Sequence, residues 1–120
     1  MKILNTIQIA TDTLIVTPTG LTKIAALKQA IKVPLNHVRS ISMGNPDILN
    51  EVKGLRAPGT SIPGYWAGDF VKNDQVTFFN AKQATPLIVI ELEHERYQRL
   101  VLSVDDAENV IAEFETVANA

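Results

Sequence analysis

The side chains that could do chemistry in this chain are histidines and carboxylates, and three of them stand together. His94 lies between Glu93 and Glu95, and imidazole with carboxylate is a ligand combination found at transition-metal sites. In a strand, neighbouring side chains point to opposite faces, so these three cannot converge on one ion. The pattern therefore predicts no metal site and no cofactor, and it places His94 at the partly exposed end of a strand.

Catalysis by paired carboxylates or by a nucleophile is not indicated either. Glu91, Glu93 and Glu95 alternate along one predicted strand, which is typical of a solvated surface or a charged sheet edge. A glycosidase instead needs two carboxylates facing each other across a cleft. The chain has no Gly-x-Ser-x-Gly motif and no cysteine. We therefore expect no enzyme; a hydrolase would need His37 or His94 to meet a Ser or Thr and an acid in one pocket.

The segment Gly54–Gly68 is the best candidate for a binding site. It holds four of the six glycines and two of the six prolines, and long loops of this kind are often functional. It lacks the Gly-Lys-Ser/Thr ending of a nucleotide-binding loop. Arg56 could bind an anion through two hydrogen bonds, or it could pair with an acid while Trp66 packs on the fold. The candidate binding residues are basic, aromatic or imidazole side chains: Lys53, Arg56, Tyr65, Trp66, His37 and Arg39.

The net charge of −2 hides an uneven distribution. Residues 1–60 carry seven bases and three acids, which gives +4, whereas residues 61–120 carry four bases and ten acids, which gives −6. Such a division can mark self-association or an anionic partner. The simpler interpretation is that the acids line a solvated strand edge and a C-terminal helix. A weakly acidic chain with 6% aromatic residues argues against nucleic-acid binding.

Length and hydropathy set the scale of the fold. A chain of 120 residues with 46% hydrophobic residues predicts a single domain over residues 1–120. A membrane-spanning helix needs roughly 20 consecutive apolar residues, and no stretch approaches that length. No signal-peptide core is recognisable, so we expect a cytoplasmic protein.

Most of the predicted elements are short strands. Leu4–Ala10 and Thr13–Thr17 are rich in Ile, Leu, Val and Thr, and the turn Thr11-Asp12 between them predicts an antiparallel hairpin. Ile31–Met43 also has strand composition, and Pro34 within it favours a sheet edge or a bulge. The other predicted strands, with turn signals between them, are Asp69–Lys72, Val76–Asn80, Leu87–Glu93 and Arg99–Val104.

Two helices are expected. Apolar residues recur at steps of three and four from Leu21 to Ile31, which predicts a short amphipathic helix near residues 21–30. Near the C-terminus, Asp105 followed by Glu108 is a capping arrangement. The helix that follows is expected to cover the open end of a curved sheet with one apolar stripe. That stripe consists of Ala107, Val110, Ile111, Phe114, Val117 and Ala118.

The order of strands followed by one helix, together with several local motifs, resembles small bacterial pleckstrin-homology-like domain proteins. The central Gly/Pro segment, Lys53-Gly54-Leu55-Arg56-Ala57-Pro58-Gly59-Thr60, is the most specific part of the resemblance, which extends from about Thr13 to Phe114. The other matching segments are Gly20–Leu27, Val33–Arg39, Ile62–Gly64, Ala67–Phe70, Val89–Leu92 and Glu95–Val101.

This resemblance implies a mainly β fold with some α-helix: a barrel of about seven antiparallel strands with a C-terminal capping helix. It brings no catalytic residues. Phosphoinositide-binding members use basic residues around the first hairpin turn, whereas the turn here contains Asp12, which argues against binding in that mode. We therefore expect a non-catalytic interaction module that binds a protein partner or itself. The alternative is a small-molecule or anion-binding protein that uses Gly54–Gly68.

Overall fold

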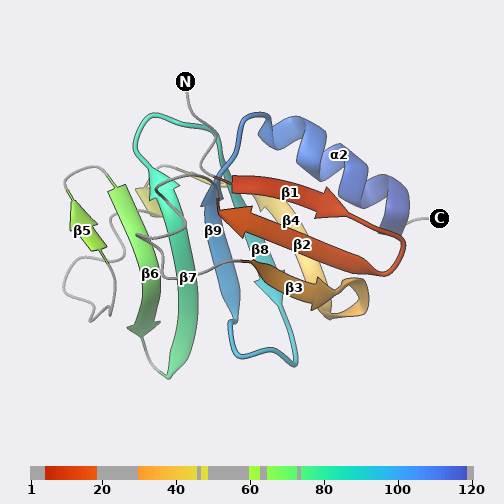
Figure 1. The fold of residues 1–120 in the computed structure, drawn as a ribbon, viewed down its shortest axis with the longest axis horizontal. Coiled ribbons are helices and arrows are strands. Elements are labelled where there is room, and N and C mark those ends of the chain that lie inside the picture. The colour runs from red at the N-terminus through yellow and green to blue at the C-terminus, as the bar shows by residue number, and fades with distance from the viewer. Residues whose placement is uncertain are drawn as a thin grey trace.

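In the computed structural model the described part of the chain is mainly β, with an α-helix at the C-terminal end (Figure 1). The structure describes residues 5–18, 30–45, 47–48, 60–62, 65–72 and 74–118. Its strands are β1 (Asn5–Ile9), β2 (Thr13–Pro18), β3 (Ile31–Pro34), β4 (Val38–Met43), β5 (Thr60–Ile62), β6 (Tyr65–Lys72), β7 (Gln75–Lys82), β8 (Leu87–Leu92) and β9 (Arg99–Ser103). A 3₁₀-helix, η1 (Leu35–His37), joins β3 to β4, and α2 (Ala107–Ala118) follows β9.

The first three strands form an antiparallel sheet in the order β1-β2-β3. The hairpin expected between the first two strands is present, with Ile9 paired to Leu14 across the turn. The buried side chains of β2 alternate with partly exposed ones, so Leu14 and Val16 face the other sheet.

The other six strands form a second sheet in the order β4-β8-β9-β7-β6-β5. Its pairs are antiparallel except for β7 and β9, which run parallel, with Phe78 opposite Leu100. After β7 the chain crosses the position of β9 and forms β8 on its far side, next to β4. It then returns to form β9 between β8 and β7. As a result β4 and β5 are the two edges of this sheet.

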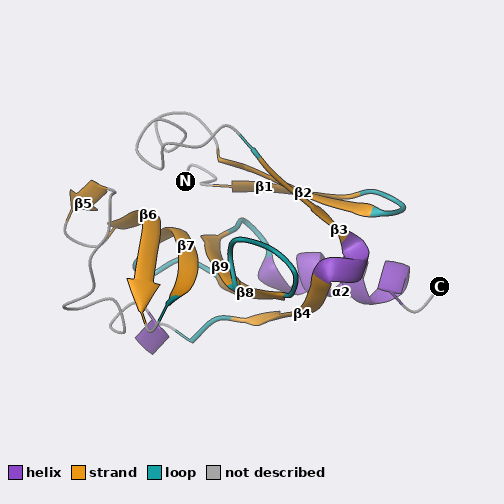
Figure 2. Cartoon of the chain, turned by 90° about the horizontal axis from the view of Figure 1, so that it is seen from below, coloured by secondary structure: helices purple, strands orange, loops and turns teal. Residues whose placement is uncertain are grey.

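The two sheets are stacked as layers, and α2 lies beside β4 and β1 (Figure 2). Apolar side chains from both layers meet in the main core, among them Leu14, Phe78, Ile90 and Leu100. Val110, Ile111 and Phe114 of α2 pack against the same core. The helix thus covers the space between the layers with one apolar stripe, as its sequence predicts.

The six-stranded sheet also buries side chains on its other face. Because strand residues alternate, Phe79, Val89 and Val101 point away from the main core and form a second cluster with Phe70 and others. Burial on both faces explains why β8 is apolar along most of its length rather than alternating.

A network of buried polar groups joins the two sheets. Asn5 of β1 donates through Nδ2 to the backbone carbonyls of Asn80 (2.9 Å) and Ser103 (2.8 Å). Asn80 donates through its own Nδ2 to Oδ1 of Asn5 at 2.8 Å. No buried side-chain nitrogen or oxygen in the described part of the chain lacks a hydrogen-bond partner. This network therefore ties β1 to β7 and β9 without an unsatisfied group.

Several details differ from the expectations. The described strands form two sheets rather than one barrel of seven antiparallel strands, since none of β1–β3 pairs with a strand of the larger sheet, and within that sheet β7 and β9 pair in parallel. Ile31–Met43 is interrupted by η1, since Pro34 cannot donate to a ladder and ends β3. The expected helix near residues 21–30 lies almost wholly outside the described residues, and Ile31, assigned to its stripe, begins β3.

The cap of α2 is also shifted by one residue. Oδ1 of Asp106, not Asp105, accepts the backbone N–H of Asn109 at 3.1 Å. A capping side chain must lie immediately before the first helical residue, and α2 begins at Ala107. The presence of α2 over Ala107–Ala118 confirms the prediction of a C-terminal helix.

Candidate functional site

β4 is an edge strand of the six-stranded sheet: among the described strands only β8 pairs with it, and α2 lies beside it. The N–H of Gly44 donates to the carbonyl of Leu87 at 2.8 Å, so these two residues form a hydrogen-bonded pair. In an antiparallel ladder, hydrogen-bonded pairs alternate with pairs that make no hydrogen bond to each other. In the second kind, the N–H and C=O of each residue point away from the partner strand. The register therefore turns the backbone groups of Ile41 and Met43 away from β8. Another strand could pair with β4 along this edge.

Four of the six residues of β4 are exposed and one of these is charged, whereas Val38 and Ile41 are buried in the main core. Arg39, Ser40 and Ser42 are exposed, and Met43 is 55% exposed. The ladder with β8 shifts beside Arg39, which marks a bulge at the start of the strand. The segment from Ser40 to Met43 is therefore a short, regular and nearly uncharged edge.

The loop between β8 and β9 lies against η1 and brings the two histidines together. Nδ1 of His37 is 2.6 Å from Oε2 of Glu95, and the backbone N–H of Glu93 donates to the carbonyl of His37 at 2.9 Å. The ring centroids of His37 and His94 are 5.7 Å apart. We call His37, His94, Glu93 and Glu95 the histidine cluster.

The placement of His94 at a strand end, and the strand geometry inferred for its neighbours, are wrong. β8 ends at Leu92, and His94 has a φ of 60°, in the left-handed region. A left-handed residue breaks the alternation of a strand, so Glu93 and Glu95 do not lie on one strand face. Among the described residues, no group of three or more His, Cys, Asp and Glu side chains could hold a metal ion.

The same loop is anchored by a second ion pair on its far side. Nη2 of Arg96 lies 2.8 Å from Oδ2 of Asp69 on β6, and its guanidinium lies 4.9 Å above the ring of Tyr97. Tyr97 is buried and donates its hydroxyl to Oδ1 of Asp69 at 2.9 Å. Asp69, through its hydrogen bond and its charge, raises the pKa of Arg96. These contacts hold the loop against β6.

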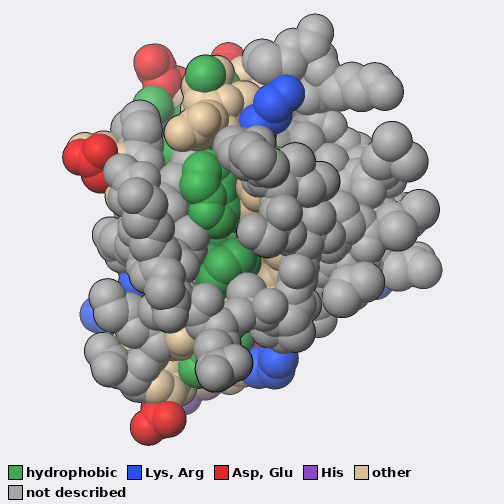
Figure 3. Space-filling model, turned by 90° about the vertical axis from the view of Figure 1, so that its left-hand side faces the viewer, with side chains coloured by type: hydrophobic (Ala, Val, Ile, Leu, Met, Phe, Trp, Pro, Cys, Tyr) green, Lys and Arg blue, Asp and Glu red, His purple; other side chains and the backbone are tan. Residues whose placement is uncertain are grey.

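The two aromatic candidates, Tyr65 and Trp66, point to opposite faces of β6. Tyr65 is half-buried and donates its hydroxyl to Oδ1 of Asn80 at 2.7 Å, as part of the buried network. Burial raises the pKa of Tyr65. Trp66 packs against the second apolar cluster. Figure 3 views the molecule from the side of β5 and β6 and shows hydrophobic side chains among the atoms at the surface. Val71 of β6 is 44% exposed.

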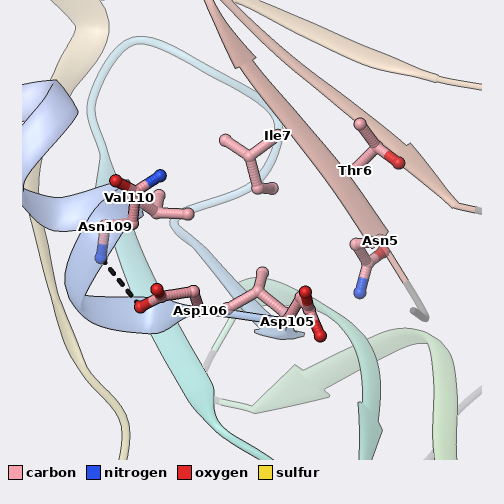
Figure 4. A pocket seen from close by; sticks show the side chains of 8 residues that line it. Asn5, Thr6, Ile7, Asp105, Asp106, Asn109 and Val110 are labelled. Atoms are coloured by element: carbon pink, nitrogen blue, oxygen red, sulfur yellow. Dashed lines mark hydrogen bonds between the residues drawn. The ribbon is translucent and has the colours of Figure 1, made fainter. Parts of the chain in front are cut away.

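An open hollow of about 210 Å³ lies between the start of β1 and the start of α2 (Figure 4). Its walls are apolar at Ile7 and Val110 and polar at Asp105 and Asp106. Neither histidine lines it, so it does not unite the imidazole, hydroxyl and acid that a hydrolase needs. The full lining is Asn5, Thr6, Ile7, Val104, Asp105, Asp106, Asn109 and Val110.

The candidate binding residues do not form one site among the described residues. His37 is held by Glu95, Arg39 lies on the edge strand, and Tyr65 and Trp66 belong to β6. Lys53 and Arg56 lie outside the described residues, with eight of the fifteen positions of Gly54–Gly68. The described positions of that segment are not a loop, as the sequence had indicated: residues 60–62 form β5 and residues 65–68 begin β6, where they pair with β7. The open edge of β4 was not singled out from the sequence, although Pro34 had indicated an edge or a bulge nearby.

A model of the bacterial PH domain family matches residues 12–118, which is most of the chain. Neither the search of curated proteins nor that of solved structures gave a match. No helix in the described residues is long and apolar enough to cross a membrane.

Proposed function

This chain belongs to the bacterial PH domain family, and we propose that it is a non-catalytic interaction module that binds a protein partner or a second copy of itself. PH-like domains are typically interaction modules and are generally non-catalytic. The partner would be an extended protein segment that adds to the free edge of the six-stranded sheet.

The open edge of β4 is the observation that carries this proposal. The backbone N–H and C=O of Met43 point away from β8, so an incoming strand could pair with them; those of Ile41 also point away, but Ile41 is only 6% exposed. Met43, at 55% exposure, offers an apolar contact beside them. Main-chain hydrogen bonds would supply affinity, and the side chains of β4 would set the preferred partner.

Other features favour a protein partner over an anion or a small molecule. The first hairpin turn exposes Asp12, which would repel a phosphorylated headgroup. His37, one of the proposed anion-binding residues, already faces the carboxylate of Glu95 at 2.6 Å. The hydroxyl of Tyr65 is engaged by Asn80.

Substituting Met43 by proline tests the proposal. The N–H of Met43 faces away from β8, so Met43→Pro removes an outward donor and leaves the ladder to β8 intact. We expect wild-type protein to show concentration-dependent dimers in size-exclusion chromatography with light scattering, or to retain a specific protein from lysate. Met43→Pro should weaken that association at least about tenfold, which corresponds to the loss of about 1.4 kcal/mol.

Two control variants separate backbone pairing from side-chain contact. Met43→Thr keeps the outward N–H and should retain most of the association. Val71→Thr removes the other large hydrophobic side chain that is exposed among the described residues, on β6, and should have no effect. A wild-type protein that stays monomeric at all concentrations and retains no partner would refute the proposal, as would association that survives Met43→Pro.

A further inference from the structure

β1 is an edge strand of the three-stranded sheet: among the described strands only β2 pairs with it. The N–H of Ala10 donates to the carbonyl of Thr13 at 2.8 Å, so these two residues form a hydrogen-bonded pair. Because the two kinds of pair alternate along an antiparallel ladder, Ile9 and Ile7 turn their N–H and C=O away from β2. Both residues are partly exposed, and another strand could pair with them. β1 has no charged residue and no proline, the usual protections of an edge.

The helix α2 lies beside this edge without filling the place next to it. Figure 2 shows α2 level with the six-stranded sheet, so the helix does not occupy the position beside β1 in the layer of β1 itself. Between the two elements lies the hollow of about 210 Å³, with Ile7 of β1 and Val110 of α2 on opposite walls (Figure 4). Pockets that enclose whole small molecules measure about 300–1,000 Å³, so this hollow suits a single side chain of a larger partner.

The charge around the hollow is negative. Asp105 and Asp106 are the only charged side chains among the described residues that line it, and Glu108 is exposed in the first turn of α2. Neither β1 nor α2 contains a lysine, an arginine or a histidine. The start of a helix carries a partial positive charge of about half a unit, which three carboxylates outweigh. This surface is therefore complementary to a cationic side chain.

We propose that an extended segment of a partner protein, rich in lysine or arginine, adds to the free edge of β1 as a further strand. Its backbone pairs with Ile7 and Ile9, and one of its side chains enters the hollow. A basic side chain of the segment lies beside Asp105 and Asp106, which select it over acidic segments. No residue of β4 lines the hollow, so this surface is separate from the edge of β4.

The probe for this surface is an acetylated and amidated peptide of about eight residues in which valine and lysine alternate. We expect calorimetry with the full chain to give one peptide per chain, and NMR signals of β1 and of the start of α2 to shift most. The affinity should fall as salt is raised, because the charges are exposed. A peptide in which valine alternates with glutamate should not bind.

Two N-methylated analogues of the probe test whether its backbone pairs with β1. Only every second N–H of an added strand faces its neighbour. Methylation of alternate amides should therefore abolish binding in one analogue and spare it in the analogue that is methylated at the other positions. Equal affinity of the two analogues would overturn the addition of a strand.

Variants of the protein test the role of charge without loss of the fold. Asp105→Asn and Asp106→Asn remove both charges, and asparagine caps a helix as well as aspartate does. Together they should weaken binding of the lysine peptide at least about tenfold. The matched control is Asp74→Asn, at an exposed turn between β6 and β7, where asparagine tolerates the φ of 64°. It should leave the affinity unchanged, as should Met43→Pro on β4.

Other occupants of the edge would give different results. Nα-acetyl-lysine amide that binds as tightly as the peptide would show a site for a small cation and would overturn the proposal. Self-association that is abolished by Asp105→Asn and Asp106→Asn together, but not by Met43→Pro, would identify a second copy of the chain as the occupant and would also overturn it. Unchanged affinity for the lysine peptide in the double variant would contradict the role of the two acids.

Discussion

At the scale of single residues, the partners of polar side chains decide which of them are available for binding. Tyr65 illustrates this, because the sequence indicates it as a binding residue within the Gly/Pro-rich segment Gly54–Gly68. Its hydroxyl instead donates to Asn80 in a buried network, and burial raises its pKa above the ordinary value of 10.0. A phenol that is held in this way contributes to stability.

Tyr65 should therefore make the fold sensitive to alkaline pH. The folded state holds the phenolic proton more tightly than the unfolded state, so the contribution is complete below the unfolded pKa of about 10 and is lost as the pH rises through the folded value. We expect Tyr65→Phe to cost about 1 kcal/mol at pH 7, through the lost hydrogen bond, and to flatten the decline in stability above pH 10. Urea unfolding at several pH values measures both effects.

The matched control is Tyr97→Phe, which removes the only other tyrosine hydroxyl of the chain. It breaks the hydrogen bond to Asp69 but leaves Tyr65 in place, so the contribution of Tyr65 to the alkaline decline should persist. An unchanged alkaline profile in Tyr65→Phe would contradict the assignment.

At the scale of elements, α2 shows that local pattern predicts a helix better than it predicts the residue that begins it. Ala107, Val110, Ile111 and Phe114 of the predicted stripe pack in or against the main core as expected, whereas Ala118 at its end is exposed. The prediction that Asp105 caps the helix is wrong. Asp105 and Asp106 are adjacent, and sequence patterns locate the start of a helix only to within one or two residues, so they do not distinguish the two aspartates. Only the observed bond from the N–H of Asn109 to Asp106 distinguishes them.

We expect Asp106→Ala to lower the stability of the fold by about 0.5–2 kcal/mol, the usual cost of losing an N-cap. Asp105→Ala, at the exposed neighbour, should cost no more than about 0.5 kcal/mol. Chemical denaturation of both variants at equal ionic strength measures the difference. A larger loss at Asp105 than at Asp106 would restore the sequence-based assignment.

At the scale of the whole molecule, two stacked sheets are joined by a small polar network inside an apolar core. Asn5 is 2% exposed and makes hydrogen bonds to both β7 and β9 from the opposite layer. Such a network specifies how one layer sits on the other, because any other placement leaves buried groups unpaired. Half of the ten acids of residues 61–120 lie on α2 or directly before it and are exposed to solvent, as the simpler interpretation of the charge distribution expects. These acids are Asp105, Asp106, Glu108, Glu113 and Glu115.

The network predicts a large effect of Asn5. Asn5→Ala leaves two carbonyls and the amide of Asn80 without their partner, so we expect a loss of at least about 2 kcal/mol. The exposed neighbour Thr6→Ala should change stability by less than about 0.5 kcal/mol. In a double-mutant cycle, Asn5 and Asn80 should couple by about 0.5–3 kcal/mol. Additive losses in urea unfolding would show that the two asparagines act independently.

The sequence alone determined the mainly β composition, the first hairpin, most of the strands and the C-terminal helix. These features follow from periods of two and 3.6 residues and from turn residues, which act over short stretches of chain. The Gly/Pro-rich segment and the family resemblance also came from the sequence, and the family model confirms the latter.

The tertiary structure decided what depends on contacts between distant residues. Hydrophobic pattern does not specify which strands become neighbours, so the parallel pairing of β7 with β9 and the open edge of β4 were not predicted. His37 and His94 are 57 positions apart, and only the packing of the β8–β9 loop on η1 places their rings together. The edge position of β4 and the contact between the two histidines therefore depend on sheet order and loop packing, which no short stretch of this sequence encodes.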